Sequence, residues 1–567
     1  MPLARADGSF HSGLFDPLLF DRIEVCRGTL HTALAPGVLG GVLNAMPANR
    51  ATPGVSLRAE AGDFGRSRLQ LAVAGPGVGL NASVIRARGW REHSRQDRRA
   101  FQGGRTHEIG GPGQIEFSVY LAEADYEVPG PLTLAEASTR PRAVSATVRR
   151  DQPRRDAALV RLAAQWRNTS REGSLAAGLG WLRLRDDFIQ LQANGATESV
   201  SEDFTAHATA SRWRRAVGAD HHVFARATFS AGGNRIDRHV NDRSIRGARF
   251  AALDTWAHTL AVSFEDLIRI RPQLGAGIGA TAVHARRAIA DRFSQPGTPA
   301  TVARAFSVAD FSPRAGLTWQ AGRSFSVRGG VSQGIEPPTF DDLLVMQGTH
   351  PNLSLRSREL RAQRATTVEA GAQGQHRALA WSVTFYRAAW RDEILRLADA
   401  AGLPRGAVNA GPTRHQGLEA ALRWRILTGP QSLSLAINST VGRHVFVGDA
   451  LYGRNRLAGS PPQVGAAELT YAHPAGWFGA LESTWVAGRT AVDHAGRLTY
   501  GGHTLAHARV GWRGRRGTVF AAVRNLLDRS HLASTAGVLD LARAPAATAI
   551  FLPGSGRAIT VGFEWKR

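Results

Sequence analysis

The sequence has little of several features that mark other classes of protein. Only one of its 567 residues, Cys26, is a cysteine, which excludes an internal disulfide framework and any metal site built from several cysteines. No apolar run reaches the roughly 18 residues that a membrane-spanning helix needs. No apolar segment follows Met1 either, so no secretory signal peptide is visible. Neither a disulfide scaffold nor a helical membrane protein is expected.

Negative charge is also scarce relative to positive charge. Lysine and arginine total 70 against 46 acidic residues, which gives a net charge of +24 and a pI of about 11.5. The basic residues are almost all arginine, with Lys566 the single lysine, and they are spread along the chain. Because no basic block or helical stripe is formed, nucleic acid is not expected as a partner. Two explanations stay open: a GC-rich genome, or a surface that attracts anions.

The pattern that is present has a period of two. In Leu379–Tyr386, Leu418–Arg425 and Ile559–Trp565, large apolar residues alternate with small or polar ones, which is typical of strands with one apolar and one polar face. On a transmembrane barrel the apolar face contacts lipid and the other faces the lumen. The residues expected toward lipid are Trp381, Phe385, Leu418, Trp424, Phe563 and Trp565. Those expected toward the lumen are Ser382, Thr384, Glu419, Arg423 and Glu564.

Such strands fit a soluble sandwich or a membrane barrel, and three features favour the barrel. The alternating segments recur from about residue 55 to the C-terminus without a helical domain between them. Aromatic residues often stand near their ends, where an aromatic girdle would lie. Short turns such as Gly75-Pro76-Gly77 alternate with long polar segments, 91–104 and 129–156, as in barrels with short periplasmic turns and long extracellular loops.

A segment near the N-terminus carries a family resemblance. Phe20-Asp21-Arg22-Ile23-Glu24-Val25-Cys26-Arg27-Gly28, followed by Ala33-Leu34 and Gly37-Val38-Leu39-Gly40-Gly41-Val42-Leu43-Asn44, resembles the end of the plug domain of TonB-dependent outer-membrane receptors. Glycines suit a chain that turns sharply inside a packed lumen. Cys26 and Thr29 depart from the family pattern.

Six further motifs follow in the family's order. They are Phe311–Leu317, Gly334–Leu343, Asn352-Leu353 with Val368–Gly371, Asn409–Gly411 with Gln416–Glu419, Val523–Asp528 and Pro553–Arg557. The resemblance implies an all-β fold: a transmembrane antiparallel β-barrel, expected to have 22 strands, over residues 54–567, after a short remnant of the plug domain over residues 1–53. It also implies an outer membrane of a Gram-negative bacterium, contacts with its lipids, a monomer, and the TonB–ExbB–ExbD complex as partner of the full-length form.

A finer resemblance, to the ferric dicitrate receptor group, lies in Gly89–Gln96, Glu127–Thr133 and Arg140–Arg142. Because guanidinium groups pair with carboxylates in bidentate fashion, arginines in these loops suit an anionic iron chelate. Solvated loop arginines without a role are the alternative. The candidate substrate-contacting residues are Arg91, His93, Arg95, Arg98, Arg99, Arg140 and Arg142. The expected function is TonB-dependent uptake of a ferric chelate, such as a siderophore or ferric citrate.

Other functions leave weaker signals. No catalytic set stands out, so an enzyme is not expected, and no cofactor or metal site is expected. Gly275–Gly279 lacks the spacing of a dinucleotide loop and suits a barrel strand. His221-His222 lacks a suitably spaced metal-binding partner and suits a turn or strand end.

The start of the chain leaves three readings open. The family's TonB box and most of the plug are expected before residue 20, and they are not found there. The chain is then a transporter with a misplaced or lost start, a passive pore or a non-functional fragment. A receptor for another nutrient, such as cobalamin or a sugar, also stays open, because fold does not fix function.

Overall fold

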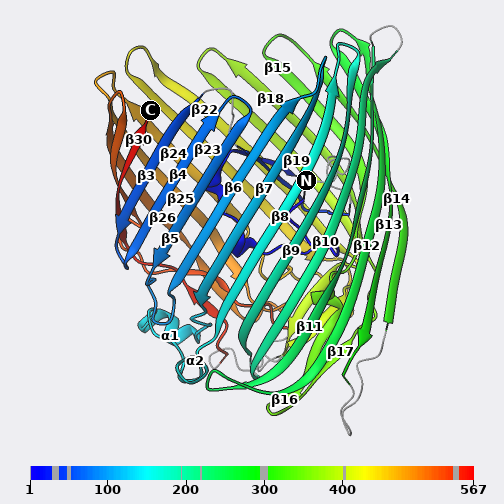
Figure 1. The fold of residues 1–567 in the computed structure, drawn as a ribbon, viewed down its shortest axis with the longest axis vertical. Coiled ribbons are helices and arrows are strands. Elements are labelled where there is room, and N and C mark those ends of the chain that lie inside the picture. Colours follow the sequence, from blue (N-terminus) through cyan, green and yellow to red (C-terminus); the bar gives the residue numbers. More distant parts are fainter. Residues whose placement is uncertain are drawn as a thin grey trace.

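The computed structural model describes residues 2–27, 37–47, 53–192, 194–216, 220–293, 304–399, 404–540 and 548–567. Its 22 barrel strands are antiparallel, each pairs with the next barrel strand along the chain, and the last pairs with the first (Figure 1). The expected fold is therefore confirmed. Within the described part of the chain, no helix is long and apolar enough to cross a membrane.

The barrel strands are β3 (Gly54–Gly62), β4 (Arg66–Gly75), β5 (Val78–Ala87), β6 (Gln96–Glu108), β7 (Gly113–Glu127), β8 (Arg154–Thr169), β9 (Gly173–Gln192), β10 (Gly195–Ala216), β11 (His221–Asp242), β12 (Ile245–Arg271), β13 (Leu274–Asp291), β14 (Arg304–Gln320), β15 (Phe325–Glu336), β18 (Gln363–His376), β19 (Leu379–Arg391), β22 (Thr413–Thr428), β23 (Ser432–Phe446), β24 (Gln463–Ala472), β25 (Trp477–Ala491), β26 (Thr499–Arg513), β27 (Gly517–Arg524) and β30 (Ala558–Lys566). The glycine run 275–279 lies in β13, and His221-His222 begins β11, both as expected.

The alternation places apolar side chains on the outer face. Phe385, Leu418 and Trp424 each expose 45% of their surface, while Glu419, on the opposite face, forms an ion pair with Arg27 inside the barrel. Because strand neighbours point to opposite faces, this register also fixes the facing of the other residues of β19 and β22. In β30, Val561 and Phe563 expose 54% and 43% of their surface, which fixes the facing of that strand in the same way. The predicted facing is confirmed.

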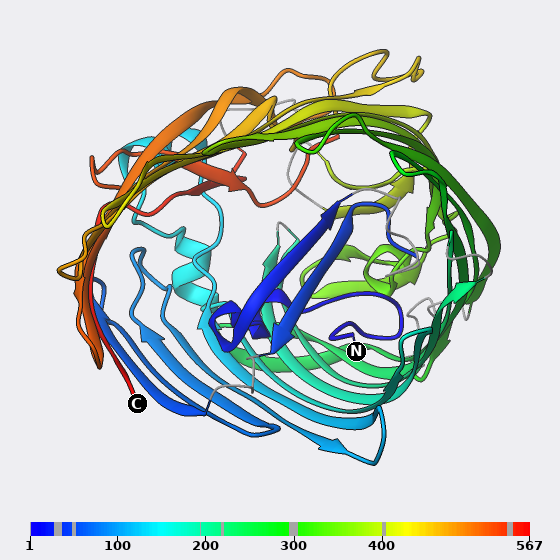
Figure 2. The same cartoon turned by 90° about the horizontal axis from the view of Figure 1, so that it is seen from above.

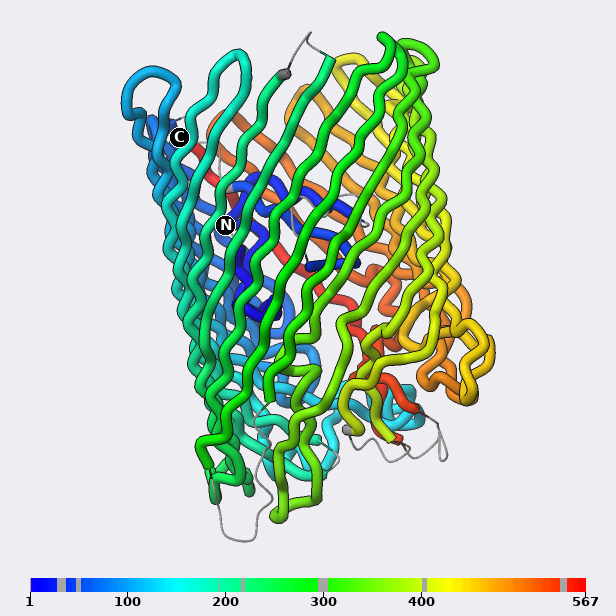
Figure 3. Tube along the Cα trace, turned by 90° about the vertical axis from the view of Figure 1, so that its right-hand side faces the viewer, coloured from blue at the N-terminus to red at the C-terminus, as the bar shows by residue number. Residues whose placement is uncertain are grey.

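The two rims of the barrel differ. At one rim the strands are joined by turns of two to four residues, such as Pro76-Gly77 between β4 and β5. Gly77 has a φ of 69°, and a Cβ there would lie 2.6 Å from the Thr106 carbonyl oxygen, so the turn requires glycine. The other rim carries the long loops, with the small helices and hairpins drawn at the lower end of the barrel in Figures 1 and 3.

The loop elements are α1 (Leu134–Thr139), α2 (Ala146–Asp151), α3 (Phe340–Leu343), and the hairpins β16 (Leu344–Thr349) with β17 (Asn352–Ser357), β20 (Ile394–Ala398) with β21 (Pro404–Asn409), and β28 (Leu532–Thr535) with β29 (Phe551–Pro553).

Strand length varies strongly around the wall. β12 has 27 residues and β11 has 22, whereas β27 has 8 and β30 has 9. At about 3.3 Å per residue, these lengths correspond to about 90 Å and about 26 Å of strand. Because the short turns share one rim, the extra length of β11 and β12 extends the wall toward the long loops.

One sequence expectation about the loops is wrong. Residues 96–104 belong to β6, and residues 154–156 belong to β8, although both segments were expected in loops. The outer face of β6 carries Arg99, Phe101 and Gly103, and its lumen face carries Gln102. With one large apolar side chain in this stretch, the alternation that identifies a strand is weak. The rest of the predicted loop, 129–153, is a loop that holds α1 and α2.

The chain before β3 lies inside the barrel. Two short 3₁₀ turns, η1 (Ser12–Leu14) and η2 (Pro17–Leu19), lead into β1 (Phe20–Arg27), which pairs with β2 (Gly41–Pro47). The β1–β2 hairpin crosses the barrel interior (Figure 2). Residues 28–36, which include part of the plug-like motif, lie outside the described residues.

Apolar packing holds this segment against the wall. Leu14 and Leu19 are buried in one cluster with Tyr120, Leu159 and Leu182, which point inward from β7, β8 and β9. Since these side chains leave water together, their burial stabilises the position of the segment. One apolar core of the molecule therefore lies between the barrel wall and the chain that it encloses.

Candidate ligand-binding site among the long loops

The loop from residue 128 to 153 is built by local capping and by one arginine. Thr133 and Glu136 form a capping box at the start of α1. Hydrogen bonds from the Thr133 backbone and hydroxyl lower the pKa of the Glu136 carboxyl. Arg91 donates to the carbonyl oxygens of Gly130, Pro129 and Ala143 at 2.7, 3.3 and 2.9 Å. This arginine therefore ties the loop after β5 to the loop after β7.

Two more of the predicted site residues, His93 and Arg142, also hold these two loops together. His93 Nε2 lies 2.7 Å from the Pro153 carbonyl oxygen, and Arg142 donates to the Trp90 carbonyl oxygen at 3.0 Å. The Arg142 guanidinium also lies over the rings of Phe64 and Trp90. The hydrogen bonds of the His93 and Arg142 side chains thus go to backbone carbonyl groups.

The remaining predicted residues point in different directions. Arg95 pairs with Asp125 and Glu127, and Arg99 pairs with Asp97 and Glu123. Arg99 shares the outer face with its cross-strand partner Val84, whereas Arg98 lies opposite Ile85 on the lumen face. Arg140 is exposed at the C-terminal end of α1. The seven residues thus share one region of the rim, and they do not line one cavity.

A second group of arginines, which sequence reasoning missed, does line one cavity. A pocket of about 730 Å³ lies where the β16–β17 hairpin, the segment after it and β21 meet the loop-side end of β14. Its lining includes Arg304, Arg356, Arg358 and Arg361 against a single acidic residue, Glu359. The lining therefore carries an excess of three positive charges.

One guanidinium group of this pocket is free. Arg356 is exposed, and its side chain makes no hydrogen bond or ion pair with another described residue. Arg358 donates to the Arg405 carbonyl oxygen at 2.5 Å, Arg361 is paired with Asp392 at 2.6 Å, and Arg304 is paired with Glu359. The Nε atoms of Arg304 and Arg358 have no partner among the described residues, and protein atoms enclose them. The Arg356 guanidinium is therefore the donor group that this cavity offers to an acceptor on a ligand.

The frame of the arginine pocket is held by an apolar cluster. Leu353, Leu355 and Leu360 alternate with the pocket arginines along the chain and are buried with Phe340 and Ile289. The loop thus folds its leucines inward against β11–β13 while Arg356 stays exposed. The sequence signal for the pocket was the arginine-rich run 356–361 next to these leucines.

A separate junction joins two other long loops. The His494 side chain is buried, its Nδ1 accepts a hydrogen bond from the Ala458 backbone at 3.2 Å, and its carbonyl accepts one from Asn455 at 3.1 Å. Burial lowers the pKa of His494 to about 4. Among the described residues, no group of three or more His, Cys, Asp or Glu side chains could hold a metal ion.

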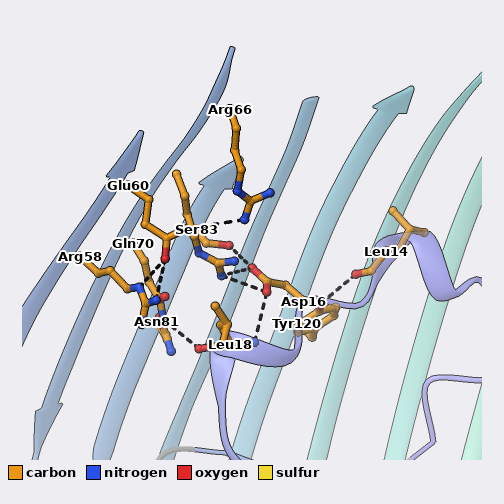
Figure 4. A network of polar contacts seen from close by, with 11 residues as sticks. Leu14, Asp16, Leu18, Arg58, Glu60, Arg66, Gln70, Asn81, Ser83 and Tyr120 are labelled. Atoms are coloured by element: carbon orange, nitrogen blue, oxygen red, sulfur yellow. Dashed lines mark hydrogen bonds and ion pairs between the residues drawn. The ribbon is translucent and has the colours of Figure 1, made fainter. Parts of the chain in front are cut away.

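Inside the barrel, polar contacts fix the N-terminal segment (Figure 4). Asp16 accepts hydrogen bonds from Arg68, at 2.7 Å, and Ser83, at 2.5 Å, while Tyr120 donates to the Leu14 carbonyl oxygen at 2.8 Å. Both Asp16 and Arg68 are buried, so each charge requires the other. Further along, the Phe340 backbone donates to Asp7 at 3.0 Å, which links this segment to the loop that holds the arginine pocket.

The sequence pattern of one known family matches most of the chain. The family is described as TonB dependent receptor-like, beta-barrel, and it matches residues 84–526. The chain belongs to the TonB-dependent receptors, β-barrel proteins of the outer membrane of Gram-negative bacteria. A search of curated protein sequences gives no match.

Solved structures agree with this assignment at the level of fold. The ferric yersiniabactin uptake receptor FyuA from Yersinia pestis superposes with a TM-score of 0.80 at 14% identity, over 96% of this chain and 85% of FyuA. The closed form of the ferric-catecholate import receptor Fiu from E. coli K12 gives 0.78 at 15%, over 99% and 88%. The unliganded ferric citrate transporter FecA gives 0.78 at 15%, over 97% and 84%.

Proposed function

We propose that this receptor takes up an anionic ferric chelate, of the siderophore or ferric citrate type, across the outer membrane. The observation that carries the proposal is the arginine pocket, with its excess of three positive charges and the free Arg356 guanidinium. Charge-assisted hydrogen bonds from guanidinium groups to carboxylates are strong and directional. The chemistry is binding and gated passage, in which no bond of the chelate is made or broken.

The size and charge of the arginine pocket support this ligand class. A volume of about 730 Å³ lies within the range of small-molecule sites. Three similar structures carry the names of receptors or transporters for ferric yersiniabactin, ferric catecholates and ferric citrate. A carboxylate-bearing chelate would pair with the free Arg356 guanidinium and balance the positive charge of the pocket. A neutral ligand such as a sugar could accept hydrogen bonds there, but it would leave the charge unbalanced.

The rim arginines have a different proposed role. Arg98 and Arg140 raise the local concentration of anions at the mouth, where the ligand makes its first contact. Arg95 and Arg99 contribute less, because each pairs with two acidic side chains. Arg91, His93 and Arg142 hold the loops in shape around that entrance. Substrate contact by these seven residues is thus proposed to be early and weak compared with contact in the arginine pocket.

Transport is proposed to be coupled to TonB through the lumen segment. In this proposal residues 1–53 are the final part of a plug, residues 54–567 are the barrel, and TonB, with ExbB and ExbD, drives the plug's rearrangement in the full-length form. The buried contacts of Asp7 and Asp16 support it, because a segment packed inside the lumen must move before a chelate can pass.

The test is uptake of ⁵⁵Fe-labelled chelates by cells that express the protein from its own locus. Uptake of ferric citrate or a carboxylate siderophore is expected, and it is expected to disappear in a strain that lacks TonB. Uptake of cobalamin or a sugar, with no iron chelate taken up, would refute the ferric proposal and leave the receptor family intact. Uptake that persists without TonB would indicate a passive pore.

A further inference from the structure

A groove lies on the outer, lipid-facing surface of the barrel. It has a volume of about 640 Å³ and lies across β5–β9. Its walls are Leu80, Phe117, Leu162, Leu179 and Trp181, which all expose between 38% and 68% of their surface. Since these side chains point away from the lumen, the groove is open to the membrane.

Small residues form the floor of this lipid-facing groove. Gly103 faces outward between Leu80 and Val119, and Ala164 lies between Phe117 and Leu179. A Cβ on Gly103 would come within 3.0 Å of the Phe101 ring and 3.1 Å of Val119 Cγ1. A larger side chain at this position would therefore fill the depression that its neighbours surround.

One cation lines the groove. Arg105 is exposed on the same face, directly opposite Val78 and Phe117 on the neighbouring strands. The Arg105 side chain makes no hydrogen bond or ion pair with another described residue. An arginine surrounded by lipid-facing apolar side chains is costly, unless its long side chain reaches the headgroups or an anion pairs with it.

The position of Arg105 along β6 indicates which headgroups it meets. Arg105 lies three residues before Glu108, where β6 ends at the short-turn rim. Three residues of strand measure about 10 Å, and the tilt of barrel strands shortens the distance along the membrane normal. The guanidinium is therefore within reach of the headgroups on the short-turn side, which in this family is the periplasmic leaflet.

We propose that this groove binds one anionic phospholipid of the periplasmic leaflet. One acyl chain lies over Gly103 and Ala164, between Phe117, Leu162 and Leu179. The phosphodiester pairs with the guanidinium of Arg105. The charge of Arg105 favours this occupant over an apolar helix of a partner protein, which would bury the guanidinium without an anion.

The site is separate from the proposed uptake function, since it lies on the outer face near the opposite rim from the arginine pocket. The test is native mass spectrometry of the detergent-solubilised receptor with added phosphatidylglycerol, and with phosphatidylcholine as the zwitterionic comparison. The wild type is expected to retain one phosphatidylglycerol with at least tenfold preference over phosphatidylcholine.

Three variants locate the lipid. Arg105→Gln is expected to abolish the preference for phosphatidylglycerol, and Ala164→Leu, which fills the floor, to reduce retention of both lipids about tenfold. The matched control is Arg212→Gln, because Arg212 is exposed on the outer face of β10 opposite Leu175 and does not line the groove. Heat-modifiable migration on gels verifies that each variant has formed the barrel.

Retention of phosphatidylglycerol that is equal in the wild type and Arg105→Gln overturns the proposal. The same holds if Arg212→Gln lowers retention as much as Arg105→Gln. A stable dimer or partner complex that Ala164→Leu disrupts, with no bound lipid, would assign the groove to a protein instead.

Discussion

The two arginine groups at the long-loop rim differ in what their guanidiniums contact. Arg91 and Arg142, in the loops after β5 and β7, donate to backbone carbonyls and hold the loops together. Arg356, in the arginine pocket, is exposed, and its side chain makes no hydrogen bond or ion pair with another described residue. Both segments contain several arginines, so arginine content alone does not identify a binding site. The availability of donors does, because a donor already paired within the protein gains little from a ligand.

The strongest test of this comparison removes two guanidinium groups of the arginine pocket. The double variant Arg356→Gln/Arg358→Gln leaves shorter, polar side chains and loses two charges. Each charge-assisted hydrogen bond contributes about 1.5–3 kcal/mol, so affinity for ferric citrate should fall about 100-fold or more. Isothermal titration calorimetry on the purified receptor measures it. An affinity within threefold of the wild type would remove the arginine pocket from the proposed function.

Substituting Arg91 tests the other arginine group, which holds the loops after β5 and β7 together. Arg91→Lys keeps the charge, but a lysine cannot reproduce the planar set of donors that meets three carbonyl oxygens. We expect a local loss of about 2 kcal/mol, seen as faster hydrogen exchange in residues 128–153. Chelate affinity should change little. A large loss of affinity with unchanged exchange would instead make Arg91 a ligand-binding residue.

A change of pH distinguishes the stability of the loops from the charge of the arginines. Arginines stay protonated as pH falls, whereas the state of His494 changes with pH. Burial lowers the His494 pKa to about 4 from 6.5. The folded state therefore binds the proton less well than the unfolded state, and the loop junction is fully stable above pH 6.5 and weakens as pH falls toward 4. At pH 5.5 the loss is about 1.4 kcal/mol.

Hydrogen exchange in residues 447–462 and 492–498 at pH 7.5 and 5.5, corrected for intrinsic exchange rates, measures this weakening. The variant His494→Gln should abolish the pH dependence. If the wild type shows equal protection at both pH values, the assigned cause is wrong.

The smallest expected effect belongs to Arg140. This residue is exposed at the end of α1, where screening by water and salt limits any charge effect. Arg140→Gln should lower the association rate of ferric citrate about twofold at low salt, with no change at 0.5 M salt. Stopped-flow kinetics measures both conditions. A salt-independent loss would show that Arg140 makes a specific contact.

The fold could be predicted because each barrel strand carries its own local signal. In β19 and β22 the alternation of large apolar and polar residues is clear, and the strands and their facing were predicted correctly. In β6 it is weak, because Gly103 and Arg105 take outer positions that large apolar residues occupy elsewhere. Because the alternation is weak there, the sequence prediction put Arg98 and Arg99 in a loop and made that arginine-rich loop too long.

The arginine pocket could not be predicted, because it depends on contacts between distant segments. Arg304 begins β14, Arg356 ends a hairpin about fifty residues later, and Ala407 belongs to another hairpin again. Nothing in local periodicity brings these residues together. The inward packing of Leu353 and Leu355 against the wall does so, and it requires knowledge of the closed barrel.

The uneven wall of the barrel has a consequence for how the entrance is built. The 27 residues of β12 extend far beyond the ends of β27 and β30, so the strand wall is higher on one side than on the other. On the side of the short strands, loops stand in place of the wall: the Arg142 guanidinium lies over the Phe64 ring, and Leu132 pairs with Phe551. A protein that approaches the entrance, such as an antibody or a protein toxin, would therefore meet a continuous ladder of strand hydrogen bonds on one side and loop contacts on the other.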